Sequence, residues 1–229
     1  MNATALRGYD DLRPLLSLMT GDEKHDPASI STLDAIWVLY DRVLRVSPAT
    51  ADAQDRDWFL LSKGHGPSAY YAVLTAKGFL DPADLAGFGG IDSALGHHPD
   101  RTLLPGVEIS SGSLGHGLPI GLGVALGLKA QGLGSQVWVL VGDAELGEGS
   151  NHEAIALAGA LGLDNLHVVV VDNRSDTHGW PGGIAARFVV EGWAAEEVDG
   201  RDHGLLAAAY TREHGGQPLV VVAHVESKK

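Results

Sequence analysis

Apolar residues early in the chain recur with the spacing of a helix that buries one face. Over residues 30–44 they fall every three or four positions, which predicts an amphipathic α-helix. Ser31 and Asp34 lie three residues apart at the start of this pattern, and we interpret the pair as a capping box. The helix is therefore expected to begin close to Ser31.

The next segments change from strand-like to helical and then lose their periodicity. Residues 56–78 predict a short strand, a turn rich in Gly, Ser and His, and a helix over about 68–77. Residues 82–105 contain no long periodic stretch and predict an extended loop with short helices. A loop of this length inside a compact domain is usually functional.

From residue 117 onward, strand-like and helical segments alternate. The strand-like segments are 136–143, 167–173, 218–225 and, more weakly, 193–200. The helical segments are 117–132, 151–163 and 202–215, and Asn151 is the candidate N-cap of the second. Strands that are apolar on both faces and alternate with helices are typical of a parallel sheet that is covered on both sides. The predicted fold class is α/β, an open and mostly parallel sheet with helices on both faces, formed by one domain over residues 1–229.

The composition excludes several classes of function. The formal net charge is −13 without any Lys/Arg cluster, so we expect no nucleic-acid partner. No residue is a cysteine, which excludes disulfides, a thiolate nucleophile and a Cys-ligated metal site among these residues. The longest apolar stretch, 118–128, is shorter than the about 20 residues that span a bilayer, and residues 1–20 lack a secretory signal. We expect no membrane association, and a cytoplasmic location is compatible with these features.

Polar residues follow two consecutive predicted strands. Asp143 ends one strand and Asn173 ends the next. A right-handed crossover would make the strands neighbours or nearly so, so both side chains could converge above the sheet. Their oxygen atoms suit Mg²⁺ or Ca²⁺ better than zinc, and Gly142 and Ala144 leave nearby backbone N–H groups accessible to an anion such as diphosphate. A simple turn is the alternative. Glu145, in the same segment, is expected on the surface.

Several sequence motifs together resemble one enzyme family. GDAELGEG followed by VVVVDN is similar to the thiamine diphosphate motif, a Gly-Asp-Gly with an Asn one βαβ unit later. The flanking segments RDWFLLSKGHG, LGHHPDR, PGVEISSGSLGHGLPIGLGVALG and EVDGRDH resemble the amino-terminal part of transketolases. The likeness is to the split form above all, in which this part is a separate subunit, and it runs over residues 26–225.

The resemblance implies a thiamine diphosphate-binding fold and a metal site. It implies that Asp143, Asn173 and the backbone carbonyl of Ser175 hold Mg²⁺, with Ca²⁺ or Mn²⁺ as possible substitutes. Gly142 and Ala144 would approach the diphosphate. The family usually has Gly at the position of Ala144, and a methyl group is tolerable there if φ is negative.

Four histidines match family motifs and are the candidate catalytic residues: His25, His65, His98 and His116. In transketolases such histidines surround the thiazolium and the substrate hydroxyls, where they donate hydrogen bonds and shuttle protons. His65 and His98 stand in well-matched motifs. His25 lies in an altered motif and His116 stands where the family more often has Gln, and a purely structural role is the alternative for these two.

Three further residues are candidate cofactor contacts by the same resemblance. Leu114 would pack against the aminopyrimidine, although an ordinary core leucine is the alternative. Thr177 stands where the family tends to place an aliphatic residue against the cofactor. Glu148 matches an acid that lies between two active sites and can join a proton relay, and a solvated glutamate is the alternative.

The resemblance also implies a partner. In the family, the glutamate that protonates the pyrimidine ring belongs to a second domain, which this sequence does not contain. We therefore expect an α₂β₂ assembly with a separately encoded transketolase carboxyl-terminal, pyrimidine-binding subunit. The expected reaction is transfer of a two-carbon ketol unit from a ketose donor to an aldehyde acceptor. Alternatives are half of a 2-oxo acid decarboxylase or carboligase, and a non-catalytic cofactor-binding subunit.

Overall fold

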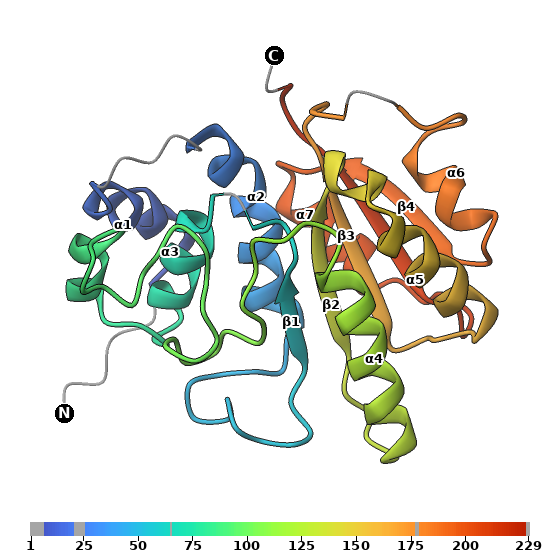
Figure 1. The fold of residues 1–229 in the computed structure, drawn as a ribbon, viewed down its shortest axis with the longest axis horizontal. Coiled ribbons are helices and arrows are strands. Elements are labelled where there is room, and N and C mark those ends of the chain that lie inside the picture. The colour runs from blue at the N-terminus through green and yellow to red at the C-terminus, as the bar shows by residue number, and fades with distance from the viewer. Residues whose placement is uncertain (1–6, 21–25, 65, 177–178, 228–229) are drawn as a thin grey trace.

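A five-stranded parallel sheet forms the centre of the molecule. The structure is a computed structural model, and it describes residues 7–20, 26–64, 66–176 and 179–227. Its strands lie in the order β1-β2-β3-β5-β4, and each is parallel to its neighbours (Figure 1). They are β1 (Trp58–Leu61), β2 (Val137–Gly142), β3 (Leu166–Asp172), β4 (Ala194–Asp199) and β5 (Leu219–His224). The sheet confirms the predicted α/β class.

Helices cover both faces of the sheet and produce two buried cores. One core contains α1 (Leu12–Leu18), α2 (Asp26–Val38), α3 (Ser68–Ala76) and α7 (His203–Tyr210). The other contains α4 (Gly117–Ala130), α5 (Gly149–Ala160) and α6 (Ile184–Val189). Within β2, Trp138 and Leu140 belong to the first core, whereas Val137, Val139 and Val141 belong to the second. This alternation explains why the strand is apolar at every position.

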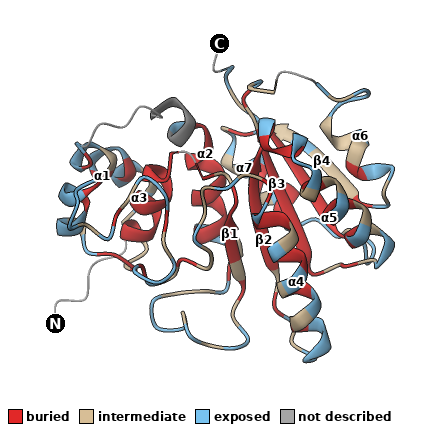
Figure 2. Ribbon diagram, viewed as in Figure 1, coloured by how far each residue is buried: buried red, intermediate tan, exposed pale blue. Residues whose placement is uncertain are grey.

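Burial along the sheet follows the strength of each strand pattern. Every residue of β2 is buried, whereas β4 at the sheet edge is half-buried or exposed (Figure 2). An edge strand has only one neighbouring strand, so the polar sequence AAEEVD is tolerated there. The weaker pattern over residues 193–200 is explained by this edge position, which was not predicted from the sequence.

The predicted capping box at Ser31 is wrong, because α2 already begins at Asp26. Ser31 and Asp34 therefore lie inside the helix, and both are buried. The helix also ends differently from the prediction over residues 30–44, since its last turn widens into a π-helical turn over Leu39–Val43. The pair Ser31 and Asp34 lies where the apolar pattern begins, but the helix itself begins about one turn earlier, at Asp26.

The predicted N-cap at Asn151 is also wrong, because α5 begins at Gly149 and Glu148 takes the cap position. Asn151 is fully buried, and its Nδ2 donates a hydrogen bond to the backbone carbonyl of Glu145 at 2.8 Å. Asn151 thus fixes the turn between β2 and α5 from inside the helix.

The connection from α3 to α4 is long, as predicted. After a short 3₁₀-helix at Pro82–Gly87, it runs without a regular element to Gly117. Tyr71 Oη donates to the Gly96 carbonyl at 2.9 Å and so ties this loop to α3. Among the described residues, no helix combines the length and the apolar character needed to cross a membrane.

Candidate functional site

Asp143 follows the carboxyl end of β2, next to the end of β3. The strands pair so that Gly142 lies opposite Val171, and the N–H of Asp143 donates to the Val171 carbonyl at 3.2 Å. The Asp143 side chain is buried, and its carboxylate accepts hydrogen bonds from Ser175 N–H and Ser175 Oγ, both at 2.6 Å. It also accepts the N–H of Asp176 at 3.0 Å. The segment after β3 is therefore folded back onto this carboxylate.

Asn173 lies in that segment, directly after β3. Its side chain is buried, and its Oδ1 has no hydrogen-bond donor among the described residues. A buried amide oxygen without a donor is costly unless something else binds it. Together with the buried carboxylate of Asp143, it offers a hard cation two oxygen ligands at the ends of neighbouring strands, so the residues present fit Mg²⁺. The contacts of Ser175 with Asp143 use its N–H and hydroxyl, both as donors.

The turn after β2 accommodates an alanine at position 144. Ala144 is exposed, and among the described non-glycine residues only Arg174 has a positive φ. A methyl group at Ala144 therefore causes no backbone strain. The N–H of Gly142, by contrast, donates to Glu145 Oε2 at 3.3 Å.

The expectation that Glu145 lies on the surface is wrong, because its side chain is buried. Its Oε1 accepts Ser62 Oγ and the N–H of Gly115, the latter at 3.0 Å. Burial raises the pKa of Glu145, while these hydrogen bonds, the one from Gly142 and the charge of Lys63 lower it. The sequence did not reveal this residue, because two of its three hydrogen-bond donors, Ser62 and Gly115, come from distant segments.

The loop before α4 carries two of the candidate cofactor and catalytic residues. Leu114 is half-buried, and His116 is exposed at the N-cap of α4. Gly115 has φ +83°, and a Cβ there would lie 2.5 Å from the Cβ of Glu148. Glu148 is exposed at the start of α5. The structure therefore brings Leu114, His116 and Glu148 to one region.

The ring of His98 lies against a backbone segment that is itself closely packed against another. A Cβ on Gly112 would lie 2.6 Å from the Cδ2 of His98, and a Cβ on Gly64 would lie 2.5 Å from the Cα of Gly112. The motifs SKGHG and SGSLGHG are thus adjacent through Gly64 and Gly112, and GHHPD adjoins them through the ring of His98. His25, His65 and Thr177 lie outside the described residues.

A cavity of about 280 Å³ opens at the carboxyl edge of the sheet, lined in part by Asp143, Asp172 and His224. His224 lies between two carboxylates, with Nδ1 3.0 Å from Asp172 Oδ2 and Nε2 2.9 Å from Glu197 Oε2. No group of three or more His, Cys, Asp or Glu side chains in the described part of the chain could hold a metal. The predicted ligand set contains only one carboxylate and so does not require such a group.

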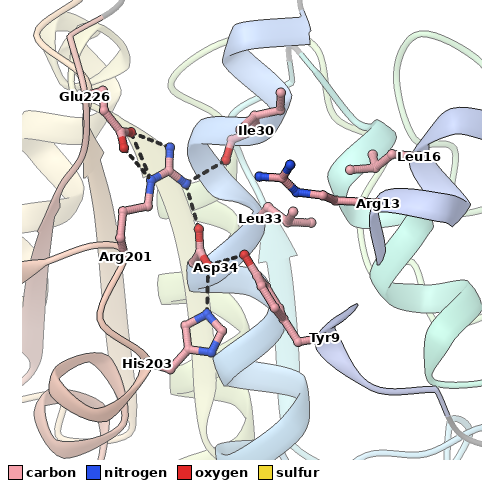
Figure 3. Close-up of a pocket in the computed structure, with 9 residues that line it drawn as sticks. All are labelled: Tyr9, Arg13, Leu16, Ile30, Leu33, Asp34, Arg201, His203 and Glu226. Carbon is pink, nitrogen blue, oxygen red and sulfur yellow. Dashed lines mark hydrogen bonds and ion pairs between the residues drawn. The ribbon is translucent and has the colours of Figure 1, made fainter. Parts of the chain in front are cut away.

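A larger cavity, of about 740 Å³, lies elsewhere and contains none of the candidate residues (Figure 3). Its polar wall is organised by Asp34, which accepts Tyr9 Oη at 2.5 Å, Arg201 at 2.7 Å and lies 2.7 Å from His203 Nε2. Arg201 also forms hydrogen bonds with Glu226 at 2.6 to 3.2 Å. These contacts connect α2, the segment after β4 and the segment after β5. They explain why Asp34 is buried inside a helix.

Comparison with known proteins identifies the family. The family model described as transketolase, thiamine diphosphate binding domain, matches residues 17–222. The chain belongs to this family. The resemblance seen in the sequence motifs is thereby confirmed.

Several relatives share most of this chain. A protein named ferredoxin fas2, from Rhodococcoides fascians, is 55% identical over 218 residues, which cover 95% of this chain and 72% of the relative. One of the subunits of apulose-4-phosphate transketolase from Actinobacillus succinogenes is 34% identical, over 87% of this chain and 75% of the relative. The present 229 residues include no cysteine, so none of them can ligate an iron–sulfur cluster through a thiolate.

Solved transketolases have the same fold. A transketolase of Pichia stipitis superposes with a TM-score of 0.75 at 29% identity, over 87% of this chain and 36% of that chain. The transketolase of Campylobacter jejuni gives a TM-score of 0.79 at 24% identity, over 98% of this chain and 38% of that chain. The chain therefore spans little more than a third of these solved transketolases.

Proposed function

We propose that this chain is the diphosphate-binding subunit of a split transketolase. In this proposal the enzyme transfers a two-carbon ketol unit from a ketose donor to an aldehyde acceptor, with thiamine diphosphate and Mg²⁺ as cofactors. The observation that carries the proposal is the pair Asp143 and Asn173, which follow the neighbouring strands β2 and β3 inside a matched thiamine diphosphate-binding domain. Relatives named as one subunit of an apulose-4-phosphate transketolase support the split form.

In this proposal the metal end of the site uses three residues. The carboxylate of Asp143, the Oδ1 of Asn173 and the carbonyl of Ser175 hold Mg²⁺, and the orphaned amide oxygen of Asn173 gains the partner it lacks among the described residues. Gly142 and Ala144 form the turn that the diphosphate approaches. The fold-back of Ser175 onto Asp143 keeps that segment close to the turn before the metal binds.

The remaining candidate residues act on the reactive part of the cofactor and the substrate. Thiamine diphosphate, when bound, supplies the carbon nucleophile and the electron sink. His98 and His116 donate hydrogen bonds to substrate oxygens and move protons, and His25 and His65 are proposed to do the same. Leu114 and Thr177 support the rings of the cofactor. Glu148 joins a carboxylate relay between two sites.

The assembly we propose is α₂β₂, in which two copies of this chain contact each other and each works with a separately encoded pyrimidine-binding subunit. Exposed apolar side chains on the neighbouring helices α4 and α5 and at the C-cap of α5 support that contact, namely Ile120 at 43%, Leu126 at 37%, Leu157 at 48% and Leu161 at 50% exposure. The α4 sequence from Gly117 to Leu128 contains no charged residue. A helix that is apolar on all sides is normally buried on all sides. Two copies with a charge of −13 each would approach most easily through such an uncharged face.

Calorimetry with Asp143→Ala tests the proposal. The wild-type chain, co-expressed with a pyrimidine-binding subunit, should bind thiamine diphosphate only when Mg²⁺ is present. Asp143→Ala should lose this uptake and keep its fold, because the donors on Ser175 and Asp176 are half-buried rather than buried and can reach water. Asp164→Ala removes an exposed carboxylate paired with Lys129 and is the matched control. Normal metal-dependent uptake by Asp143→Ala would refute the site.

Turnover assays separate the function from its alternatives. The complex should convert a ketose donor and an aldehyde acceptor, and this chain alone should turn over neither. Release of carbon dioxide from a 2-oxo acid would instead indicate a decarboxylase or carboligase. Binding of cofactor without any turnover would indicate a non-catalytic subunit.

A further inference from the structure

Glu145 is a buried carboxylate that accepts hydrogen bonds from three separate parts of the chain. Its side chain is 2% exposed. Its Oε1 accepts Ser62 Oγ–H and the N–H of Gly115, and its Oε2 accepts the N–H of Gly142. Ser62 follows β1, Gly115 precedes α4, and Gly142 ends β2. One carboxylate therefore joins two strand ends to the loop before α4.

The loop from Leu114 to Gly117 is fixed at several backbone atoms by this cluster. The Gly115 N–H is bound by Glu145, and the Gly115 carbonyl accepts Ser150 Oγ–H at 2.6 Å. The Gly117 N–H donates to Ser62 Oγ at 3.0 Å, and the same hydroxyl donates to Glu145. Glu145 thus holds the loop both directly and through Ser62.

Close packing around Gly115 and Gly117 restricts the loop to one conformation. A Cβ on Gly117 would lie 2.3 Å from the Cβ of Ser62, and a Cβ on Gly115 would lie 2.5 Å from the Cβ of Glu148. Contacts this short mean that the loop backbone lies directly against its neighbours. The polar anchor and the packing therefore specify the same loop position.

We propose that Glu145 is a positioning residue, whose carboxylate holds the loop carrying Leu114 and His116 in the conformation that receives the cofactor. The cofactor part of this inference rests on the proposed function. The donors around Glu145 are two amides and a hydroxyl, and the two oxygens of one carboxylate provide acceptors for all three.

The two residues of the turn after β2, Gly142 and Ala144, differ in whether their backbone N–H groups are already engaged within the chain. The N–H of Gly142 is engaged by Glu145, so it points into the cluster. Ala144 is exposed. In the proposed function, the N–H of Ala144 would therefore be the amide of this pair left for the diphosphate.

Amide exchange in the chain without cofactor tests the anchor directly. Glu145→Gln keeps one oxygen, which can serve Ser62 and Gly115, and places an NH₂ group against the N–H of Gly142. Exchange at Gly142 should therefore accelerate about tenfold, which corresponds to about 1.4 kcal/mol, and exchange at Gly115 should stay close to wild type. Glu145→Ala should accelerate both. Glu153→Gln, an exposed residue on α5, should change neither.

Wild-type exchange at both glycines in Glu145→Ala would overturn the proposal. If that variant does not fold, Ser62→Ala decides the question instead. It removes the acceptor of Gly117, so exchange there should accelerate about tenfold while Gly142 keeps its acceptor on Glu145. Unchanged exchange at Gly117 would equally overturn the proposal.

Cofactor titration then separates positioning from general stability. Glu145→Ala should raise the Kd for thiamine diphosphate at saturating Mg²⁺ about tenfold. Leu128→Ala removes a buried side chain at the other end of α4, and it should lower Tm without changing this Kd. A wild-type Kd in Glu145→Ala would overturn the proposal. If the wild-type complex binds no thiamine diphosphate, the proposed function fails, whereas amide exchange still decides the role of Glu145.

Discussion

Gly64→Ala tests whether the motifs around His98 depend on direct contact between backbone segments. A Cβ on Gly64 would lie 2.5 Å from the Cα of Gly112 and 2.7 Å from its nitrogen. Gly112 cannot move freely, because its own position lies against the His98 ring. The added methyl group must therefore displace the Gly112 backbone, and His98 with it.

The size of this displacement sets the expected effects. Carbon atoms in contact normally lie about 3.5–4.0 Å apart, so the Gly112 backbone must move by about 1 Å. Overpacking of this kind costs about 1–3 kcal/mol. At about 2–4 °C per kcal/mol for a chain of this size, Tm should fall by about 2–12 °C. A misplacement of about 1 Å near reacting groups can lower kcat/KM about 100-fold, which corresponds to about 2.7 kcal/mol in the barrier.

The assay needs the assembled enzyme and a matched glycine. Tm is measured by calorimetry, and kcat/KM is measured at saturating cofactor in the complex with the pyrimidine-binding subunit. Gly134→Ala is the control, because a Cβ there meets no atom within 4 Å and its φ is ordinary. This variant should have wild-type or slightly higher stability. If Gly64→Ala matches Gly134→Ala in both measurements, the backbone contact is refuted. A lowered Tm with unchanged kcat/KM would refute its connection to the position of His98.

Two further predictions concern assembly and pH. Leu157→Lys places a charge on the exposed apolar face of α5, so it should shift sedimentation of the complex from α₂β₂ to αβ, whereas an unchanged sedimentation coefficient would argue against that face as the contact. Burial lowers the pKa of His167 to about 3. Because the unfolded chain has an ordinary pKa of about 6.5 at this residue, it binds the extra proton between these values. The free energy of unfolding should therefore decrease as pH falls below about 6.5, by up to about 1.4 kcal/mol per pH unit from this group. His167→Phe should flatten this dependence in urea titrations at pH 5 and 7, and equal slopes in the two proteins would contradict the assignment.

The parallel sheet could be predicted because its strands have a simple local signature. In β2 and β3 the chain is apolar at almost every position, and only a strand covered on both faces needs that. The alternation with helices then fixed the class of fold. The positions of Asp143 and Asn173 could be predicted for the same reason, since polar residues that directly follow such strands must lie at one edge of the sheet.

Glu145 could not be predicted, because nothing near it in the sequence explains its burial. The segment DAELGE is acidic, which favours a solvated turn, but two of the three donors to Glu145 come from Ser62 and Gly115, distant in the chain. Asp34 was misjudged in the same way. Its spacing from Ser31 suggested a local cap, whereas its partners Arg201 and His203 come from the segment after β4.

The glycines show how the separate motifs come together in the fold. Gly64 contacts Gly112, Gly112 contacts the ring of His98, and Gly117 contacts Ser62. In each pair the absence of a side chain lets two segments approach to a distance that any Cβ would prevent. These glycines can be recognised in the sequence as parts of motifs, but the segment that each one contacts cannot be predicted from it. Their pairing follows only from the fold, because the sheet brings the ends of β1 and β2 beside the loop before α4. Side chains such as Glu145 then hold a backbone arrangement that the glycines make possible, which is why a single methyl group at Gly64 should disturb residues on three motifs at once.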